Sequence, residues 1–226
     1  TEWSQTSYIW SMFGKKKGNE IDGNSLMREY AKGISSGRNA EQYLPNSLCM
    51  HLLIETLDNK IIKTRISPNK RNDNPGTWAF TLGEQLDQED FNDGNSFHSD
   101  FMLRWLRRAF KEEYKMDQNT YIDIVDEDSF RVLSLDFEAD RYNFALLCTV
   151  RLNYAFESFE KKIAPLLSID EAIELKGIDI GEVPSILLTY NMDERKVYHP
   201  SSYLRLLVFY FHKLGVGRAQ NNIAEQ

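Results

Sequence analysis

The sequence predicts an α/β/α sandwich with a mixed sheet, an N-terminal extension and a C-terminal helix. Three observations predict this class: two segments patterned as hairpins, an amphipathic helix between them, and a late apolar helix. The chain has 226 residues, of which 42% are hydrophobic and 12% aromatic, which is enough to bury a sizeable core. We expect residues 1–45 to form the extension and residues 46–226 to form the folded domain.

Before the central helix, the pattern predicts one short helix and three strands. The short helix can be capped by Asn24. A hairpin is expected where two apolar runs flank the turn at residues 57–60. An acidic loop at residues 85–95 follows the third strand. The expected elements are residues 25–31 (helix), 49–55, 61–66 and 77–82 (strands).

The central helix is expected to begin after Ser99 or Asp100 and to run to about Lys115, because apolar residues recur at helical spacing. A second hairpin follows it, then a helix pair or one helix broken by Pro165, a short strand, and a terminal helix ended by Gly215. These later elements are expected at residues 130–136 and 143–152 (hairpin), 157–167 and 168–175 (helices), 186–189 (strand) and 203–214 (helix).

Charge and cysteine usage limit the partners and the compartment. A net charge of -7 argues against broad nucleic-acid binding and against anionic membranes, because phosphate groups attract basic surfaces. The most apolar run, residues 204–211, is too short to span a bilayer. Cys49 and Cys148 lie in apolar segments, which favours two buried free thiols in a reducing cytoplasm. The chain begins at Thr1 without a methionine, so we expect it to come from a longer protein with a fused or partner domain.

The end of the central helix carries the most informative pattern. Arg108 and Glu112 lie one helical turn apart, and Glu113 is adjacent. Mg2+ prefers oxygen ligands and is usually held by carboxylates together with substrate phosphates. Paired carboxylates beside an arginine therefore indicate a site for a divalent cation and a phosphate chain. The same pattern is also ordinary in solvated helices, where an Arg–Glu pair contributes about 0.3–0.5 kcal/mol.

The spacing of this segment resembles the Nudix box, GX5EX7REUXEEXGU, in which U is a bulky apolar residue. Gly94, Asp100 and Arg108 follow the spacing, with aspartate in place of the first glutamate. Ala109 stands where the family has a glutamate that joins the metal-binding group, and Lys115 replaces the late glycine. The resemblance covers about residues 46–190 and is to a degenerate form of the box.

The opening glycine of the box has two candidates. In the family, a strand with an aromatic residue leads into a glycine-containing loop whose carbonyl faces the metal. The segment Trp78–Glu84 resembles that strand and loop, so we favour Gly83 over Gly94 and regard residues 85–95 as an insertion. Glu84 would then lie at the mouth of the site, where it could replace the carboxylate missing at Ala109.

The resemblance implies a Mg2+- or Mn2+-dependent hydrolase that cleaves a diphosphate linkage in a nucleotide or nucleotide conjugate. Glu112, Glu113 and the Gly83 carbonyl would hold the metal, Arg108 would orient the carboxylates, and Glu84 would help to activate water. A late glutamate could share that last role. The candidates for the late glutamate are Glu157, Glu160, Glu171 and Glu174.

Two other functions stay open. The altered box also suits a catalytically weak or inactive domain that binds a nucleotide-like ligand as a sensor in a larger protein. The acidic loop at residues 84–93 could instead form a protein–protein surface. Three aromatic residues could stack on a base, although aromatic residues in strands more often lie in the core. They are Trp78, Tyr142 and Phe144.

Overall fold

The computed structural model describes residues 47–68, 75–80, 82–87, 90, 100–138, 143–167, 172–189, 197–199 and 201–225. The chain divides into two compact units. In the smaller unit, the described residues are 47–49, 135–138 and 143–146, where the ring centroids of Phe137 and Phe144 lie 5.2 Å apart. The larger unit contains all the other described residues, including the predicted catalytic and metal-binding residues Gly83, Glu84, Arg108, Glu112 and Glu113.

Seven strands of the described chain form one sheet. The strands are β1 (Ser47–Glu55), β2 (Lys60–Ile66), β3 (Trp78–Ala79), β4 (Leu82–Gln85), β5 (Val125–Glu138), β6 (Asn143–Leu152) and β7 (Ala172–Asp179). The order is β3-β2-β1-β6-β5, with β4 paired to β1 and β7 paired to β2. Strand β2 is antiparallel to β1, β3 and β7, and a parallel bridge joins Trp78 to Tyr198.

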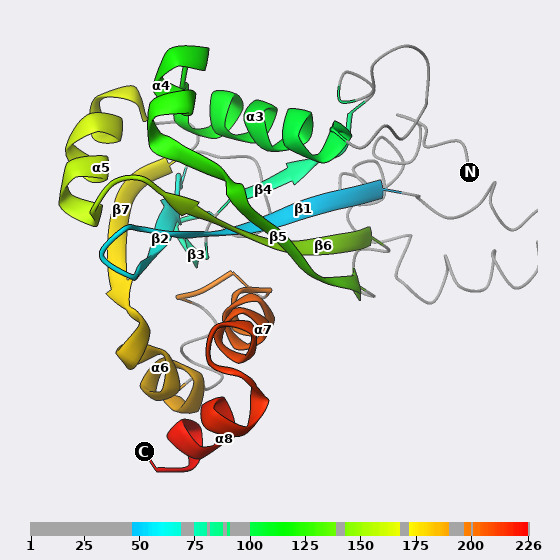
Figure 1. The fold of residues 1–226 in the computed structure, drawn as a ribbon, viewed down its shortest axis with the longest axis vertical. Coiled ribbons are helices and arrows are strands. Elements are labelled where there is room, and N and C mark those ends of the chain that lie inside the picture. The colour runs from blue at the N-terminus through cyan, green and yellow to red at the C-terminus, as the bar shows by residue number, and fades with distance from the viewer. Residues whose placement is uncertain are drawn as a thin grey trace, which may run out of the picture. The chain divides into compact units, whose positions relative to one another are not determined.

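Helices cover both faces of the sheet in the larger unit (Figure 1). The α-helices are α3 (Phe101–Tyr114), α4 (Gln118–Ile124), α5 (Phe156–Ile163), α6 (Val183–Thr189), α7 (Ser202–Leu214) and α8 (Val216–Ala224). Helices α3 and α4 lie over one face, and α6, α7 and α8 lie over the other. The predicted α/β/α sandwich is confirmed.

A buried core fills each side of the sheet. Under α3, the hydroxyl of Tyr114 lies 3.4 Å from that of Thr64 on β2, and the Tyr114 ring also contacts Phe159 of α5. On the other face, Ile61 of β2 packs with Phe209 of α7 in a cluster that also includes α6 and α8. Because neighbouring residues of a strand point to opposite faces, β2 contributes alternate side chains to the two cores.

Several predicted elements are confirmed, and two are wrong. The first hairpin, the central helix, the strand at 143–152 and the terminal helix lie where the pattern predicts them. Residues 172–179 form strand β7 rather than a helix, because their backbone pairs with β2 from Lys60 to Ile66. Residues 183–189 form helix α6 rather than a strand, since Pro184 suits a first helical turn and Asp179 and Glu182 form a capping box just before it.

The structure also adds elements. Helices α4 and α8 are not predicted, and the predicted strand at 77–82 is two short strands, β3 and β4. Strand β5 begins at Val125, five residues before its predicted start at Phe130. The expected helix at residues 25–31 lies outside the described residues, and the division at residue 45 stays a prediction.

None of the described helices is both long enough and apolar enough to cross a membrane.

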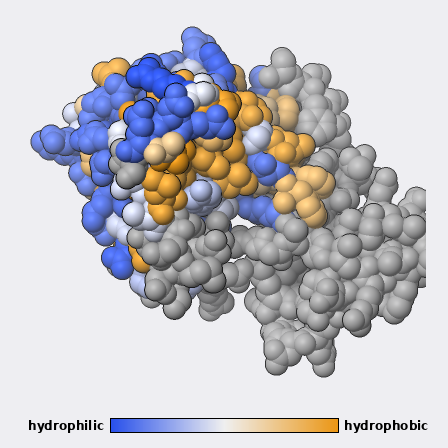
Figure 2. Space-filling model, turned by 90° about the horizontal axis from the view of Figure 1, so that it is seen from below, coloured by the Kyte–Doolittle hydropathy of each residue, from blue (hydrophilic) through white to orange (hydrophobic). Residues whose placement is uncertain are grey.

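Figure 2 views the molecule from below, on the side where α6 and α8 lie in Figure 1, and shows hydrophobic residues gathered among hydrophilic ones. Leu188 of α6 and Val216 of α8 are 53% and 56% exposed, respectively.

Candidate functional site

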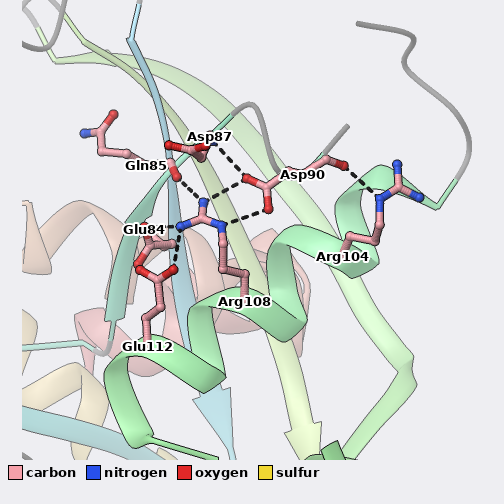
Figure 3. A network of polar contacts seen from close by, with 7 residues as sticks. All are labelled: Glu84, Gln85, Asp87, Asp90, Arg104, Arg108 and Glu112. Atoms are coloured by element: carbon pink, nitrogen blue, oxygen red, sulfur yellow. Dashed lines mark hydrogen bonds and ion pairs between the residues drawn. The ribbon is translucent and has the colours of Figure 1, made fainter. Parts of the chain in front are cut away.

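The guanidinium of Arg108 is the centre of a polar network between α3 and β4 (Figure 3). Its Nε and Nη2 donate to the two carboxylate oxygens of Asp90 at 2.9 and 2.8 Å. Its Nη1 donates to Glu84 Oε1 at 2.8 Å and to Glu112 Oε1 at 3.4 Å. Nη2 also donates to the backbone carbonyl of Gln85.

The amphipathic pattern of α3 places these side chains. Trp105, Ala109 and Phe110 are fully buried and fix one side of the helix against the sheet. Arg108 and Glu112, one turn apart, therefore lie on its flank, where they meet β4. Strand β4 is held by pairing with β1, so it presents Glu84 to Arg108.

Asp90 is the most deeply buried acid of the network, with 1% of its side chain exposed. A bidentate contact between a carboxylate and a guanidinium is a strong, charge-assisted interaction. It holds the pKa of Arg108 above its usual range, an effect to which Glu84 also contributes and which burial opposes. Arg104 donates from Nε to the Asp90 carbonyl at 2.8 Å, so two arginines of α3 tie this loop residue to the helix.

The network has more negative than positive charge. Asp90 already balances Arg108, and Glu84 then lies beside Glu112 and Glu113, with no second cation of the described residues paired to its carboxylate. Burial raises the pKa of Glu84 to about 7, and the two neighbouring glutamates add to that effect, whereas Arg108 opposes it. A cluster of this kind attracts a cation.

The residues of the Nudix-like box differ in how far they are exposed to solvent. Glu112 is about half exposed (52%), Glu113 is partly buried, and Gly83 is exposed on β4. Ala109, in contrast, has no exposed surface and packs in the core. Among the described residues, no group of three His, Cys, Asp or Glu side chains is already arranged to hold a metal ion. The metal assignment of Glu112, Glu113 and Gly83 stays a proposal.

The structure brings Glu84, Arg108 and Glu112 together, and the choice between Gly83 and Gly94 stays a prediction. Asp100, which stands where the family has its first glutamate, forms an ion pair with Arg104 at 2.5 Å. Gly94 lies outside the described residues. Asp90 is the functional residue that the sequence does not reveal, because it sits in an acidic loop with no periodicity to mark a buried position.

The late glutamates take other positions. Glu157 and Glu160 lie on α5, and Glu174 on β7 forms ion pairs with Arg65 and Lys176. Of the candidate stacking residues, Trp78 is largely buried at 9% exposure, and Phe144 contacts Phe137 in the smaller unit. Glu171 and Tyr142 lie outside the described residues.

Comparison with known proteins gives matches in structure alone. No family model matches the sequence, and no curated protein matches it. A solved Deinococcus radiodurans structure is 10% identical, with 70% of this chain and 80% of that chain covered and a TM-score of 0.46. The MutT protein from Methanosarcina mazei Go1 is 18% identical, with 74% and 94% covered and a TM-score of 0.41.

A third solved structure is a bifunctional NMN adenylyltransferase/ADP ribose pyrophosphatase from Francisella tularensis, complexed with AMP and a Mn ion. It is 13% identical to this chain, with 85% of this chain and 47% of that chain covered and a TM-score of 0.43. At these identities and TM-scores, the similarities assign neither a family nor a function to this chain.

Proposed function

We propose that this chain is a divalent-metal-dependent hydrolase that cleaves a diphosphate linkage in a nucleotide or nucleotide conjugate. The observation that carries the proposal is the convergence of Glu84, Glu112 and Glu113 beside an arginine that Asp90 already neutralises. The cluster has an excess of carboxylate charge at the surface of α3, which a cation and its bound phosphates would balance.

The donor chemistry fits Mg2+ or Mn2+. Glu112, Glu113 and the carbonyl of Gly83 supply hard oxygen ligands, which both ions prefer. When bound, the metal would neutralise charge on the diphosphate and acidify a coordinated water. Arg108 keeps the Glu84 and Glu112 carboxylates in place, so its role is positioning rather than contact with the substrate.

Glu84 is the proposed proton acceptor. It lies on a strand paired to β1 and is anchored by one oxygen to Arg108, so its position is fixed by the fold. The position of Ala109 is buried, which leaves Glu84 as the residue of β4 that could supply the third carboxylate. A carboxyl whose pKa lies near neutrality can take a proton from an attacking water and release it again.

A second candidate function is a nucleotide-binding sensor or regulatory module of a larger protein. Two observations favour it: the family's glutamate position is the buried Ala109, and the described acidic residues are not already arranged as a metal site. The ligand would be nucleotide-like in both cases. Cys49 and Cys148 are buried and are not joined by a disulfide, which supports a reducing compartment that we propose to be the cytoplasm.

The test is phosphate release from nucleoside diphosphate conjugates and nucleoside triphosphates, with Mg2+ and with Mn2+. We expect metal-dependent turnover in the wild type and a loss of about 100-fold or more in Glu113→Gln. Glu225→Gln, which removes an exposed glutamate at the end of α8, is the matched control and should keep full activity.

Two results would decide against the hydrolase. Turnover that persists in Glu113→Gln would place the activity elsewhere. An inactive wild type that nucleotides still protect against heat would favour the binding module.

A further inference from the structure

Two lysines face each other on the sheet, away from the Arg108 network. Lys63 of β2 and Lys176 of β7 are register partners in an antiparallel pair. Both ammonium groups lie over the ring of Trp78, with Nζ at 4.8 and 5.2 Å from the ring centroid, respectively. Lys63 also donates a hydrogen bond to the Tyr198 hydroxyl at 3.2 Å.

This lysine pair lies on the opposite sheet face from α3. Thr64, the next residue of β2, points to Tyr114 of α3. Ile61, two residues before Lys63, packs against the C-terminal helices. Because side chains alternate along a strand, Lys63 shares the face of Ile61. The lysine pair and the carboxylates of Glu84 and Glu112 are therefore separate sites.

Like charges directly opposite each other on neighbouring strands destabilise a sheet. Here Glu174 lies 3.1 Å from Lys176 and 3.6 Å from Arg65, so it is shared by two cations, and Glu182 acts more strongly than Glu174 on Lys63. Among the described residues, no carboxylate lies within ion-pair distance of Lys63, whose contacts are a hydroxyl and two aromatic rings.

The surroundings of Lys63 disfavour its charge. Burial lowers the pKa of the Lys63 ammonium group, and Lys176 lowers it further, while Glu182 and Glu174 oppose the change. The aromatic rings partly compensate, since a cation over an aromatic face is attracted to it. Lys63, Lys176 and Arg65 carry one charge more than the neighbouring acids Glu174 and Glu182, so the cluster has a local excess of positive charge.

The geometry points to Lys63 and Lys176 as a binding site for a phosphate-type oxyanion, with Trp78 and Tyr198 holding Lys63 in place. Two ammonium groups on adjacent strands match a compact group with two negative charges, and such a group would relieve their repulsion. Trp78 is largely buried, so the ligand is recognised by its charge rather than by stacking on this ring.

The test is calorimetric titration of the full chain with inorganic phosphate at constant ionic strength and neutral pH. Lys63→Met and Lys176→Met each remove one ammonium group, and Lys161→Met is the control because it removes an exposed lysine of α5. We expect phosphate to bind the wild type and the control alike, and each site variant to bind about tenfold more weakly, the loss of one charge-assisted hydrogen bond.

Two further measurements sharpen the test. Acetate, a monoanion, should bind much more weakly than phosphate; equal affinity would overturn the phosphate assignment. Without phosphate, Lys63→Met should melt at or above the wild-type temperature, because it removes the repulsion from Lys176. The proposal is overturned if the wild type binds no phosphate, or if both site variants bind it as the wild type does.

Discussion

Replacing Glu84 by glutamine should stabilise the protein at neutral pH. In the folded state, burial raises the pKa of this carboxyl from 4.5 to about 7, so the folded protein holds the proton more tightly than the unfolded chain does. The contribution of Glu84 to the stability of the wild type therefore falls as pH rises from 4.5 to about 7 and then levels off.

The size of this stabilisation follows from the shift in the pKa of Glu84. The change in the pKa of Glu84 from 4.5 to about 7 destabilises the folded state by about 3 kcal/mol at pH values above about 7. The side chain is only 13% exposed, so solvent screening reduces this figure little. Glutamine removes the charge and can still accept a hydrogen bond from Arg108, so Glu84→Gln should recover most of that free energy.

The assay is urea denaturation across this pH range in metal-free buffer. The two proteins should be equally stable near pH 4.5 and should diverge as the pH approaches about 7, with the variant the more stable. As a control, Glu157→Gln should change stability by less than about 0.5 kcal/mol at every pH. A difference between Glu84→Gln and wild type that does not depend on pH, or a variant that is less stable at neutral pH, would refute the reasoning.

Three further substitutions test the packing around the site by urea denaturation. Asp90→Asn replaces the bidentate carboxylate of Arg108 by a neutral amide, while Glu84 and Glu112 still pair with the arginine, and should cost about 1–3 kcal/mol; an unchanged stability would mean that the Arg108–Asp90 pair is not buried in solution. Ala109→Glu puts a carboxylate at a position with no exposed surface and should cost about 3 kcal/mol, whereas a neutral effect would show that this position reaches solvent. Gly177→Ala places a methyl group 2.7 Å from Phe156 Cγ and should cost about 1–3 kcal/mol, unless the ring shifts freely.

Local periodicity accounts for the elements that the sequence predicts. The central helix has a complete apolar stripe, and the first hairpin has a turn between two β-rich runs, so neighbouring residues specify both. Strand β7 is different. Its residues are specified by pairing with β2, more than a hundred positions earlier in the chain, and helical or strand preference within the segment does not show this.

In the candidate site too, some residues can be predicted from local pattern and others cannot. Glu84 is predicted because it follows an aromatic strand directly, and Arg108 and Glu112 because they share one face of a helix. Asp90 and the lysine pair are not predicted. Asp90 is buried through contacts made by a loop, and Lys63 meets Lys176 only when β2 and β7 pair. Contacts of this kind depend on topology rather than on local pattern.

Mn2+ binding, followed by the loss of the free-ion signal in electron paramagnetic resonance, tests the proposed carboxylate site most directly. The proteins to compare are the wild type, Glu112→Gln, Glu113→Gln and the control Glu225→Gln. We predict one bound Mn2+ per chain in the wild type and the control, and an affinity weaker by about tenfold or more in the two helix variants. Binding that is unchanged in both helix variants, or absent in the wild type, would contradict the assignment of a metal site to these carboxylates.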